Sequence, residues 1–229
     1  MKREAYIIMK YKNILFDLDG TITDSQEGIV NSVKYAVEKS GMPPLSDATL
    51  LKFIGPPLDY SFVNYAGMTP DEADVAVAYY RETYSVKGIF ENTLYKGIEE
   101  VLKALSESGA RVILATSKPE HFARIILEHF GLTKYFYFIA GSLLSGERKN
   151  KEDVIAYVLS CTGISEGEKL TTVMIGDRHH DIEGAHINGL KCAAVLYGYG
   201  DREEFENAGA DFIIDTPHGI IDFLKEEDK

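Results

Sequence analysis

Two carboxylates two positions apart, followed at once by a glycine, are the side chains of this sequence best placed to do chemistry. They are Asp17 and Asp19, which follow the short apolar run at residues 14–16. One carboxylate can attack a phosphoryl group and form an aspartyl-phosphate, while the second protonates the departing oxygen and later takes a proton from water. Aspartate is equally common in turns, so this pair alone also fits a purely structural role.

A second acidic pair, Asp177 and Asp181, follows the apolar run at residues 171–175. Four carboxylates that meet at one site repel one another and raise one another's pKa values unless a cation lies among them. Ligation by oxygen alone favours Mg²⁺, a hard ion that keeps several waters and bridges to phosphate. The alternative is that these two aspartates cap the helix that follows them.

Hydroxyl groups and free backbone N–H groups come at the end of the apolar run at residues 111–116. Thr116 and Ser117 stand there, directly before a predicted helix, where backbone N–H groups can bind an anion. We therefore expect both residues to bind phosphate. Ser117 and Glu120 also have the spacing of a capping box, and the two roles are compatible.

A basic cluster of Arg148, Lys149 and Lys151 precedes the next predicted helix. One of these cations can neutralise the charge of a phosphoryl group while it is transferred. We assign this role to Lys151, with Lys149 as the alternative. Lysines at helix starts are mostly solvated, so this assignment depends on the other motifs.

The elements that must position these residues alternate between strand and helix. Near-continuous apolar runs predict buried parallel strands, and amphipathic stretches predict the helices between them. The predicted strands are residues 12–16, 111–116, 135–140, 171–175, 192–196 and 211–214, and the predicted helices of this part are residues 97–108, 118–130 and 151–161. The fold class is α/β, a Rossmann-like parallel sheet flanked by helices. Its carboxyl edge is where such sheets bind ligands.

The segment at residues 24–93 differs, because it contains helix signals and no convincing strand. Its sharpest signal is the run Thr69-Pro70-Asp71-Glu72, which offers an N-cap threonine, a proline at the first helical position and a glutamate three residues after the cap. We predict two domains, an α/β core at residues 1–23 and 94–229 and an inserted helical cap at residues 24–93.

Composition argues against several classes of protein. Acidic residues outnumber basic ones 36 to 24, and the formal charge of −12 disfavours nucleic acid as a partner. Two cysteines give no disulfide framework, and no apolar run approaches the ~20 residues of a membrane span. We expect a cytoplasmic protein that does not bind membranes. His179 and His180 lack zinc-ligand partners at usable spacing and are interpreted as exposed loop residues. The sequence carries no signal for oligomeric state.

In this order, the motifs resemble those of the haloacid dehalogenase-like phosphatase superfamily over nearly the whole chain. Residues 17–25 match the first motif, Thr116 the second, Lys151 the third, and residues 176–177 with Asp181 the fourth. The resemblance implies that Asp17 is the nucleophile, Asp19 the general acid/base, Thr116 a phosphate ligand and Lys151 the charge-neutralising base. Many relatives carry a Lys-Pro pair in the third motif, and this chain has no proline there, which leaves Lys149 open.

The chain looks most like the phosphoglycolate phosphatase or 5′-nucleotidase-like branch. The resemblance implies a phosphatase acting on a small phosphorylated metabolite of the phosphoglycolate, nucleotide or sugar-phosphate kind. It also implies Mg²⁺ held by Asp17, the backbone carbonyl of Asp19, Asp177 and Asp181, and a mobile helical cap. Gly55 and Arg81 are candidate substrate contacts in that cap. The alternatives are a phosphomutase of the β-phosphoglucomutase type and a non-catalytic phospholigand binder or receiver-like regulator.

Overall fold

The computed structural model describes residues 9–145 and 147–225. The chain divides into two compact units. One, here called the core unit, consists of Met1–Ile22 with Leu94–Lys229, and the other, the helical unit, is Thr23–Thr93. Each is described on its own below.

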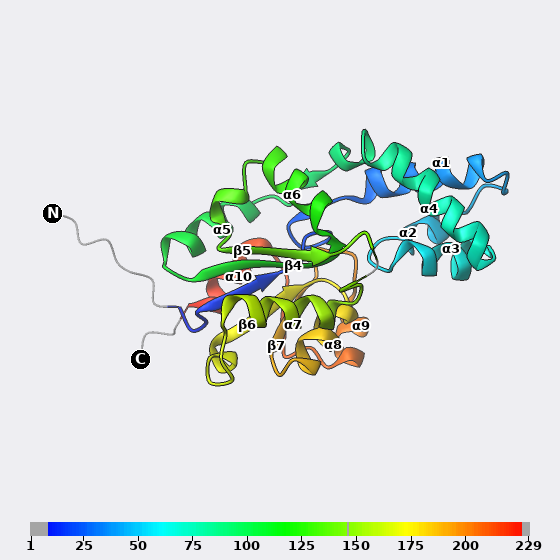
Figure 1. Cartoon of the computed structure of the whole chain (residues 1–229). Helices are drawn as coiled ribbons and strands as arrows, with labels where there is room; N and C mark the ends of the chain where they lie inside the picture. Colours follow the sequence, from blue (N-terminus) through cyan, green and yellow to red (C-terminus); the bar gives the residue numbers. More distant parts are fainter. Residues whose placement is uncertain (1–8, 146, 226–229) are drawn as a thin grey trace. The chain divides into compact units, whose positions relative to one another are not determined.

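A six-stranded parallel sheet forms the centre of the core unit, in the strand order β5-β4-β1-β6-β7-β8 (Figure 1). The strands are β1 (Asn13–Phe16), β4 (Arg111–Pro119), β5 (Phe138–Ser142), β6 (Thr172–Gly176), β7 (Lys191–Val195) and β8 (Phe212–Ile214). All six predicted strands are present, and the predicted α/β fold class is confirmed. The central strand β1 pairs with β4 and β6, so the residues after these three strands meet at one edge of the sheet.

Two strands differ from the predicted bounds by more than one residue at an end. β4 continues past Thr116 to Pro119, with a shift in its register against β5 between these residues. β5 begins later than predicted, because Thr133–Tyr135 form a short 3-10 helix, η2, before it. Ser117 and Lys118 therefore belong to β4 and not to the helix that follows it.

Helices cover both faces of the sheet (Figure 1). One face carries α7 (Lys151–Thr162), α8 (His179–Ile187) and α9 (Arg202–Ala208), and the helices of the other side are α5 (Ile98–Glu107), α6 (Glu120–His129) and α10 (Pro217–Leu224). A continuous apolar cluster joins the first of these faces to the strands, and it contains Leu15, Met174, Val158, Ile182 and Phe205. The remaining short element of the core unit is η3 (Glu168–Thr171). Burial on both faces explains why the strands read as continuous apolar runs.

The helical unit contains α1 (Gln26–Lys39), α2 (Asp47–Leu51), α3 (Leu58–Ala66), α4 (Pro70–Tyr84) and η1 (Gly88–Phe90). A Cβ atom on Gly28 of α1 would lie 1.9 Å from the carbonyl oxygen of Gly88, so α1 and η1 approach closely only because residue 28 is glycine. Two short strands, β2 (Thr23–Asp24) and β3 (Thr93–Leu94), pair where the chain enters and leaves this unit. They are not predicted from the sequence, because two residues are too few for a strand pattern.

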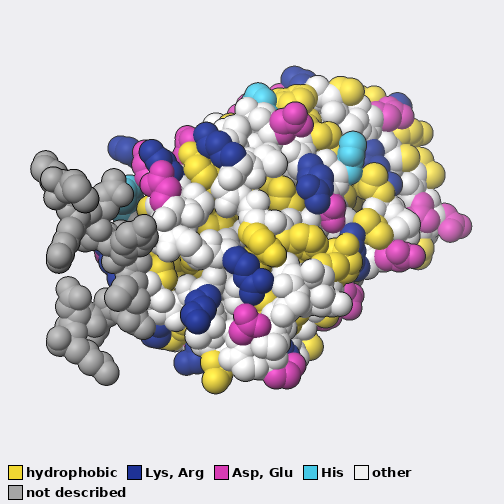
Figure 2. Space-filling view, turned by 60° about the vertical axis from the view of Figure 1, so that its left-hand side comes forward, with side chains coloured by type: hydrophobic (Ala, Val, Ile, Leu, Met, Phe, Trp, Pro, Cys, Tyr) yellow, Lys and Arg dark blue, Asp and Glu magenta, His cyan; other side chains and the backbone are white. Residues whose placement is uncertain are grey.

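The described surface mixes charges of both signs. On the face shown in Figure 2, basic and acidic side chains are interspersed and form no continuous basic patch. Within residues 9–145 and 147–225, no helix is both long enough and apolar enough to cross a membrane.

The capping box predicted at the start of α4 is confirmed. The backbone N–H of Thr69 donates to the Glu72 carboxylate at 2.8 Å, and the backbone N–H of Glu72 donates to the Thr69 hydroxyl at 3.4 Å. Pro70 occupies the first helical position, where its missing N–H costs nothing. These contacts fix where α4 begins.

We expect Thr69→Ala to lower the free energy of unfolding by about 1 kcal/mol, the usual cost of losing an N-cap hydroxyl. Urea denaturation of the purified protein measures the difference. Thr83→Ala, in the same helix but away from its start, is the matched control and should change stability by less than about 0.5 kcal/mol. Equal losses in the two variants would contradict a capping role for Thr69.

Candidate active site

The ammonium group of Lys151 lies between the carboxylates of the predicted nucleophile, Asp17, and a predicted metal ligand, Asp181. Its Nζ is 2.8 Å from Oδ1 of Asp17 and 2.7 Å from Oδ1 of Asp181, and it donates a hydrogen bond to the Ala115 carbonyl at 3.0 Å. The Lys151 side chain is only 2% exposed. As the first residue of α7, it reaches across the carboxyl edge of the sheet to residues that follow β1 and β6. The structure thus places Lys151 of the basic cluster against Asp17.

Asp177 is fully buried directly after β6 and is held by two donors. The Thr21 hydroxyl donates to one carboxylate oxygen at 3.1 Å, and the backbone N–H of Tyr199 donates to the other at 2.8 Å. A Cβ atom on Gly20 would lie 2.1 Å from Asp177 Oδ2, and one on Gly198 would lie 2.4 Å from Asp177 Cβ. Glycine at these two positions therefore lets the backbone close around the carboxylate.

Asp181 performs two tasks with its two oxygens. Oδ2 accepts hydrogen bonds from the backbone N–H groups of Asp177 and Arg178, each at 3.1 Å, at the start of α8. Oδ1 is turned toward Lys151. Asp181 therefore caps α8, as the alternative held, and also belongs to the site. The carboxylate of Asp177 does not cap α8, because it accepts from Thr21 and Tyr199.

Burial and mutual repulsion perturb the charges in this cluster. Burial, with the neighbouring charges of Asp181 and Asp17, raises the pKa of Asp177 well above its ordinary value. Burial likewise raises the pKa of Asp181 to about 6, although the charge of Lys151 opposes this. For Lys151, burial lowers the pKa, but the carboxylates of Asp17 and Asp181 outweigh it and raise the pKa above its ordinary range. The cluster carries more negative charge than its own lysine offsets.

Three of the carboxylates lie close enough together to hold a metal ion. Asp17, Asp177 and Asp181 each offer an oxygen, and these oxygens lie within 4.8 Å of one another. Oδ1 of Asp17 and Oδ1 of Asp181 are buried, form no regular hydrogen bond and lie against the ammonium of Lys151. Three carboxylates that offer oxygens this close together, two of them buried and without a regular hydrogen bond, fit a hard cation such as Mg²⁺.

Thr116 and Ser117 lie at the same edge, but their local structure differs from the prediction. The Thr116 hydroxyl is buried and accepts a hydrogen bond from the backbone N–H of Lys118 at 3.2 Å. The predicted capping box of Ser117 with Glu120 is wrong: α6 begins after Pro119, and no side chain caps it. The physical reason is that β4 continues through these residues, which holds Ser117 in extended backbone.

Asp19 has a partner that the sequence did not indicate. Nζ of Lys118 donates to both of its carboxylate oxygens, at 3.1 and 2.8 Å. The sequence predicts a helix at residues 118–130, and at its start Lys118 would be a solvated side chain. Because β4 is extended as far as Pro119, its side chain instead reaches the acidic edge of the sheet.

A glycine-rich loop at residues 197–200 is the second feature that the sequence analysis missed. It follows β7, the Tyr197 hydroxyl donates to the Thr21 carbonyl at 2.9 Å, and the backbone of Tyr199 holds Asp177. The signal available was a Tyr-Gly-Tyr-Gly run directly after a predicted strand. Alternating glycines at the ligand-binding edge of a parallel sheet indicate close backbone approach.

The two adjacent histidines lie on the first turn of α8 and are not exposed loop residues. Nδ1 and the backbone N–H of His179 contact Glu204 of α9 at 2.7 and 2.8 Å. Burial and the charges of His179, Arg178 and Lys151 lower the pKa of His180 to about 4. Contrary to the prediction, Glu183 brings a third potential metal ligand to within 4.8 Å of both histidines. The nearby positive charges oppose a cation there.

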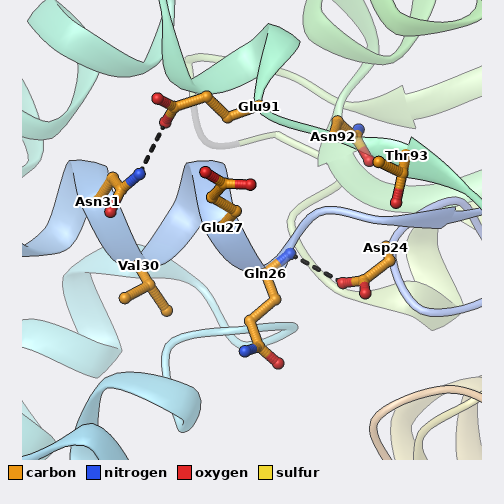
Figure 3. Close-up of a pocket in the computed structure, with 8 residues that line it drawn as sticks. All are labelled: Asp24, Gln26, Glu27, Val30, Asn31, Glu91, Asn92 and Thr93. Carbon is orange, nitrogen blue, oxygen red and sulfur yellow. Dashed lines mark hydrogen bonds between the residues drawn. The ribbon is translucent and has the colours of Figure 1, made fainter.

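A pocket of about 300 Å³ in the helical unit differs from the site described above because its lining has no basic side chain (Figure 3). Its lining residues include three acids and no lysine or arginine, and they are Asp24, Gln26, Glu27, Val30, Asn31, Glu91, Asn92 and Thr93. The close-up shows that they come from α1 and from the two ends of the unit. Such a pocket repels a phosphate dianion. Gly55 and Arg81 also belong to the helical unit, and their substrate role stays a prediction.

The raised pKa of Asp177 predicts a pH-dependent stability. Between the ordinary pKa of 3.8 and its raised value, the native state binds more protons than the unfolded state, so stability falls as pH rises through this window. In buffer without divalent cations, we expect wild type to lose more stability between pH 4 and pH 8 than Asp177→Asn, by more than about 1 kcal/mol. Urea denaturation at several pH values measures this, with Asp215→Asn, an exposed carboxylate, as the control. If stability fell equally with pH in wild type and in Asp177→Asn, the pKa of Asp177 would not be raised in the native state.

Comparison with known proteins gives consistent results. A family model described as haloacid dehalogenase-like hydrolase matches residues 14–195. A 5′-nucleotidase of Pseudomonas aeruginosa is 44% identical over 196 residues, which cover 86% of this chain and 87% of that protein. The tyrosine-protein kinase PtkA of Mycobacterium tuberculosis is 38% identical over 213 residues, which cover 93% of this chain and 71% of that protein.

Among solved structures, one described as a predicted phosphatase from Clostridium acetobutylicum is similar over most of its length. Its TM-score is 0.88 at 44% sequence identity, covering 93% of this chain and 97% of that chain. The family match spans β1 to β7 and so includes the residues after β1, β4 and β6. The chain belongs to the haloacid dehalogenase-like hydrolases, and it is a phosphoric monoester hydrolase.

Proposed function

We propose that this protein is a Mg²⁺-dependent phosphatase that transfers the phosphoryl group of a small phosphomonoester to Asp17 and then to water. The observation that carries the proposal is the buried contact of Lys151 with Asp17 and Asp181, with Asp177 close to both. It brings a nucleophile, a cation and metal ligands together at one sheet edge.

In the first step, a carboxylate oxygen of Asp17 attacks phosphorus while the bond from phosphorus to the substrate oxygen breaks. Asp19 gives its proton to that leaving oxygen, so the alcohol departs neutral. In the second step, Asp19 takes a proton from water, which attacks the aspartyl-phosphate and releases inorganic phosphate and free Asp17. Lys151 stays charged throughout, because its pKa is raised, and it offsets the charge near Asp17.

The proposed ligands of Mg²⁺ are the carboxylates of Asp17, Asp177 and Asp181 with the backbone carbonyl of Asp19. When bound, the ion supplies positive charge that offsets the negative charge of the phosphoryl oxygens. The hydroxyl of Thr116 and the backbone of Ser117 are proposed to bind the same phosphoryl group, because they lie on β4 just beyond its last residue paired with β1.

For the substrate, we propose a nucleoside 5′-monophosphate. The support is the 44% identity to a protein named 5′-nucleotidase, which extends over 87% of that protein. Phosphoglycolate and sugar phosphates are the other members of the class. The likeness to a tyrosine-protein kinase suggests a second acceptor for the phosphoryl group, a tyrosine hydroxyl in place of water. The tests below distinguish transfer to these two acceptors.

We expect Asp17→Asn to abolish turnover, because an amide is too weak a nucleophile to form the intermediate. Asp19→Ala should retain a slow reaction, lowered roughly 10²- to 10⁴-fold, and should accumulate phosphate on Asp17. Phosphate release and the intact mass of acid-quenched enzyme measure the two effects, with Asp215→Asn as the control. Turnover at more than a trace by Asp17→Asn would rule out Asp17 as the nucleophile.

A substrate panel with and without Mg²⁺ tests the remaining parts of the proposal. We expect EDTA to stop phosphate release, Mg²⁺ to restore it, and nucleoside 5′-monophosphates to show the highest kcat/KM. The panel also contains phosphoglycolate, sugar phosphates, and ATP with a tyrosine peptide. A higher kcat/KM for phosphoglycolate would overturn the nucleotide assignment alone. A requirement for a sugar bisphosphate would indicate a phosphomutase, and peptide phosphorylation a kinase.

A further inference from the structure

Lys118 forms a largely buried ion pair with Asp19. Its Nζ lies 3.1 and 2.8 Å from the two oxygens, and the side chains of Lys118 and Asp19 are 7% and 15% exposed. An ion pair at this depth differs from a surface pair, because removing one partner leaves a charge with little access to water. The pair therefore restricts where the Asp19 carboxylate can point.

The backbone that carries Lys118 is itself held in place. Its N–H donates to the Thr116 hydroxyl at 3.2 Å, and the Ser142 hydroxyl donates to the Ser117 carbonyl at 2.7 Å. A Cβ atom on Gly141 of β5 would lie 2.5 Å from the Lys118 carbonyl oxygen, so glycine permits this close approach of the two strands. The lysine thus extends from the rigid end of a strand.

The two lysines of the site contact different carboxylates. Lys151 contacts Asp17 and Asp181, which belong to the group of oxygens suited to a cation, and Lys118 contacts Asp19, which does not. Asp17 and Asp19 are only two residues apart, yet the mechanism requires one to be the nucleophile and the other to move protons. A free Asp19 carboxylate would be drawn to any divalent cation bound by its neighbours.

We propose that Lys118 is a positioning residue that keeps the Asp19 carboxylate away from the cation ligands and oriented for proton transfer. The inference rests on the proposed function, because it presupposes that Asp19 is the general acid/base. In this proposal Lys118 acts by orienting Asp19, whereas Thr116 is proposed to bind the phosphoryl group directly.

A double-mutant cycle on kcat tests this inference, because a residue that acts through Asp19 has nothing left to act on when Asp19 is absent. We expect Lys118→Met to lower kcat by roughly 10- to 100-fold, part of the contribution of general acid/base catalysis. KM should change by less than about threefold. The double variant Asp19→Ala/Lys118→Met should be no slower than Asp19→Ala alone, within about threefold, and Lys118→Arg should recover most of the wild-type rate.

Lys103→Met, a replacement of an exposed lysine on α5, is the matched control and should keep the wild-type kcat. Thermal unfolding of every variant shows whether it is folded, and Lys118→Gln replaces Lys118→Met if that variant is not. Wild-type kcat in Lys118→Met or Lys118→Gln would overturn the inference. So would losses that multiply in the double variant together with a raised KM, since these indicate a direct phosphate ligand. An inactive wild type, or an active Asp17→Asn, would instead overturn the proposed function.

Discussion

The contact of Lys151 with Asp17 and Asp181 is the interaction on which the site depends, because it holds two negative charges together where water is nearly excluded. Carboxylates brought this close in a buried space repel one another strongly. Burial, together with the charges of Asp181 and Asp17, raises the pKa of Asp177 well above its ordinary value. The divalent cation that we propose would supply positive charge among these acids.

Tight backbone turns make that packing possible. Gly20 has a φ of +86° and lies against Asp177, and Gly198 approaches the same carboxylate from the loop after β7. Gly176 stands next to Asp181, where a Cβ atom would lie 2.2 Å from its carboxyl carbon. Side chains at these positions would push the carboxylates apart. The acidic cluster thus owes its density to the absence of side chains around it.

Much of this arrangement could be predicted from the sequence. Buried parallel strands leave apolar runs, and acids that directly follow such runs must meet at the carboxyl edge, which brought Asp17 and Asp177 together. The two wrong predictions, a capping box at Ser117 and a helical position for Lys118, have one cause. The strand β4 continues to Pro119, past the residues whose spacing resembles a helix start. That continuation turned Lys118 from a predicted helix residue into the partner of Asp19. Pairing of this kind depends on strand ends and registers, which short patterns do not encode.

The position of β1 in the middle of the sheet affects how the protein is made. Thr21 and its partner Asp177 are 156 positions apart, and the hydrogen-bonded side chains of Asn13 and Thr172, at the other end of the same strands, are 159 apart. A ribosome therefore releases Asp17 long before Asp177 and Asp181, and the whole helical unit is synthesised in between. Until β6 joins β1, Asp17 is an ordinary carboxylate on a nascent chain. The acidic cluster at the carboxyl edge is therefore complete only after β6 has been synthesised and has paired with β1.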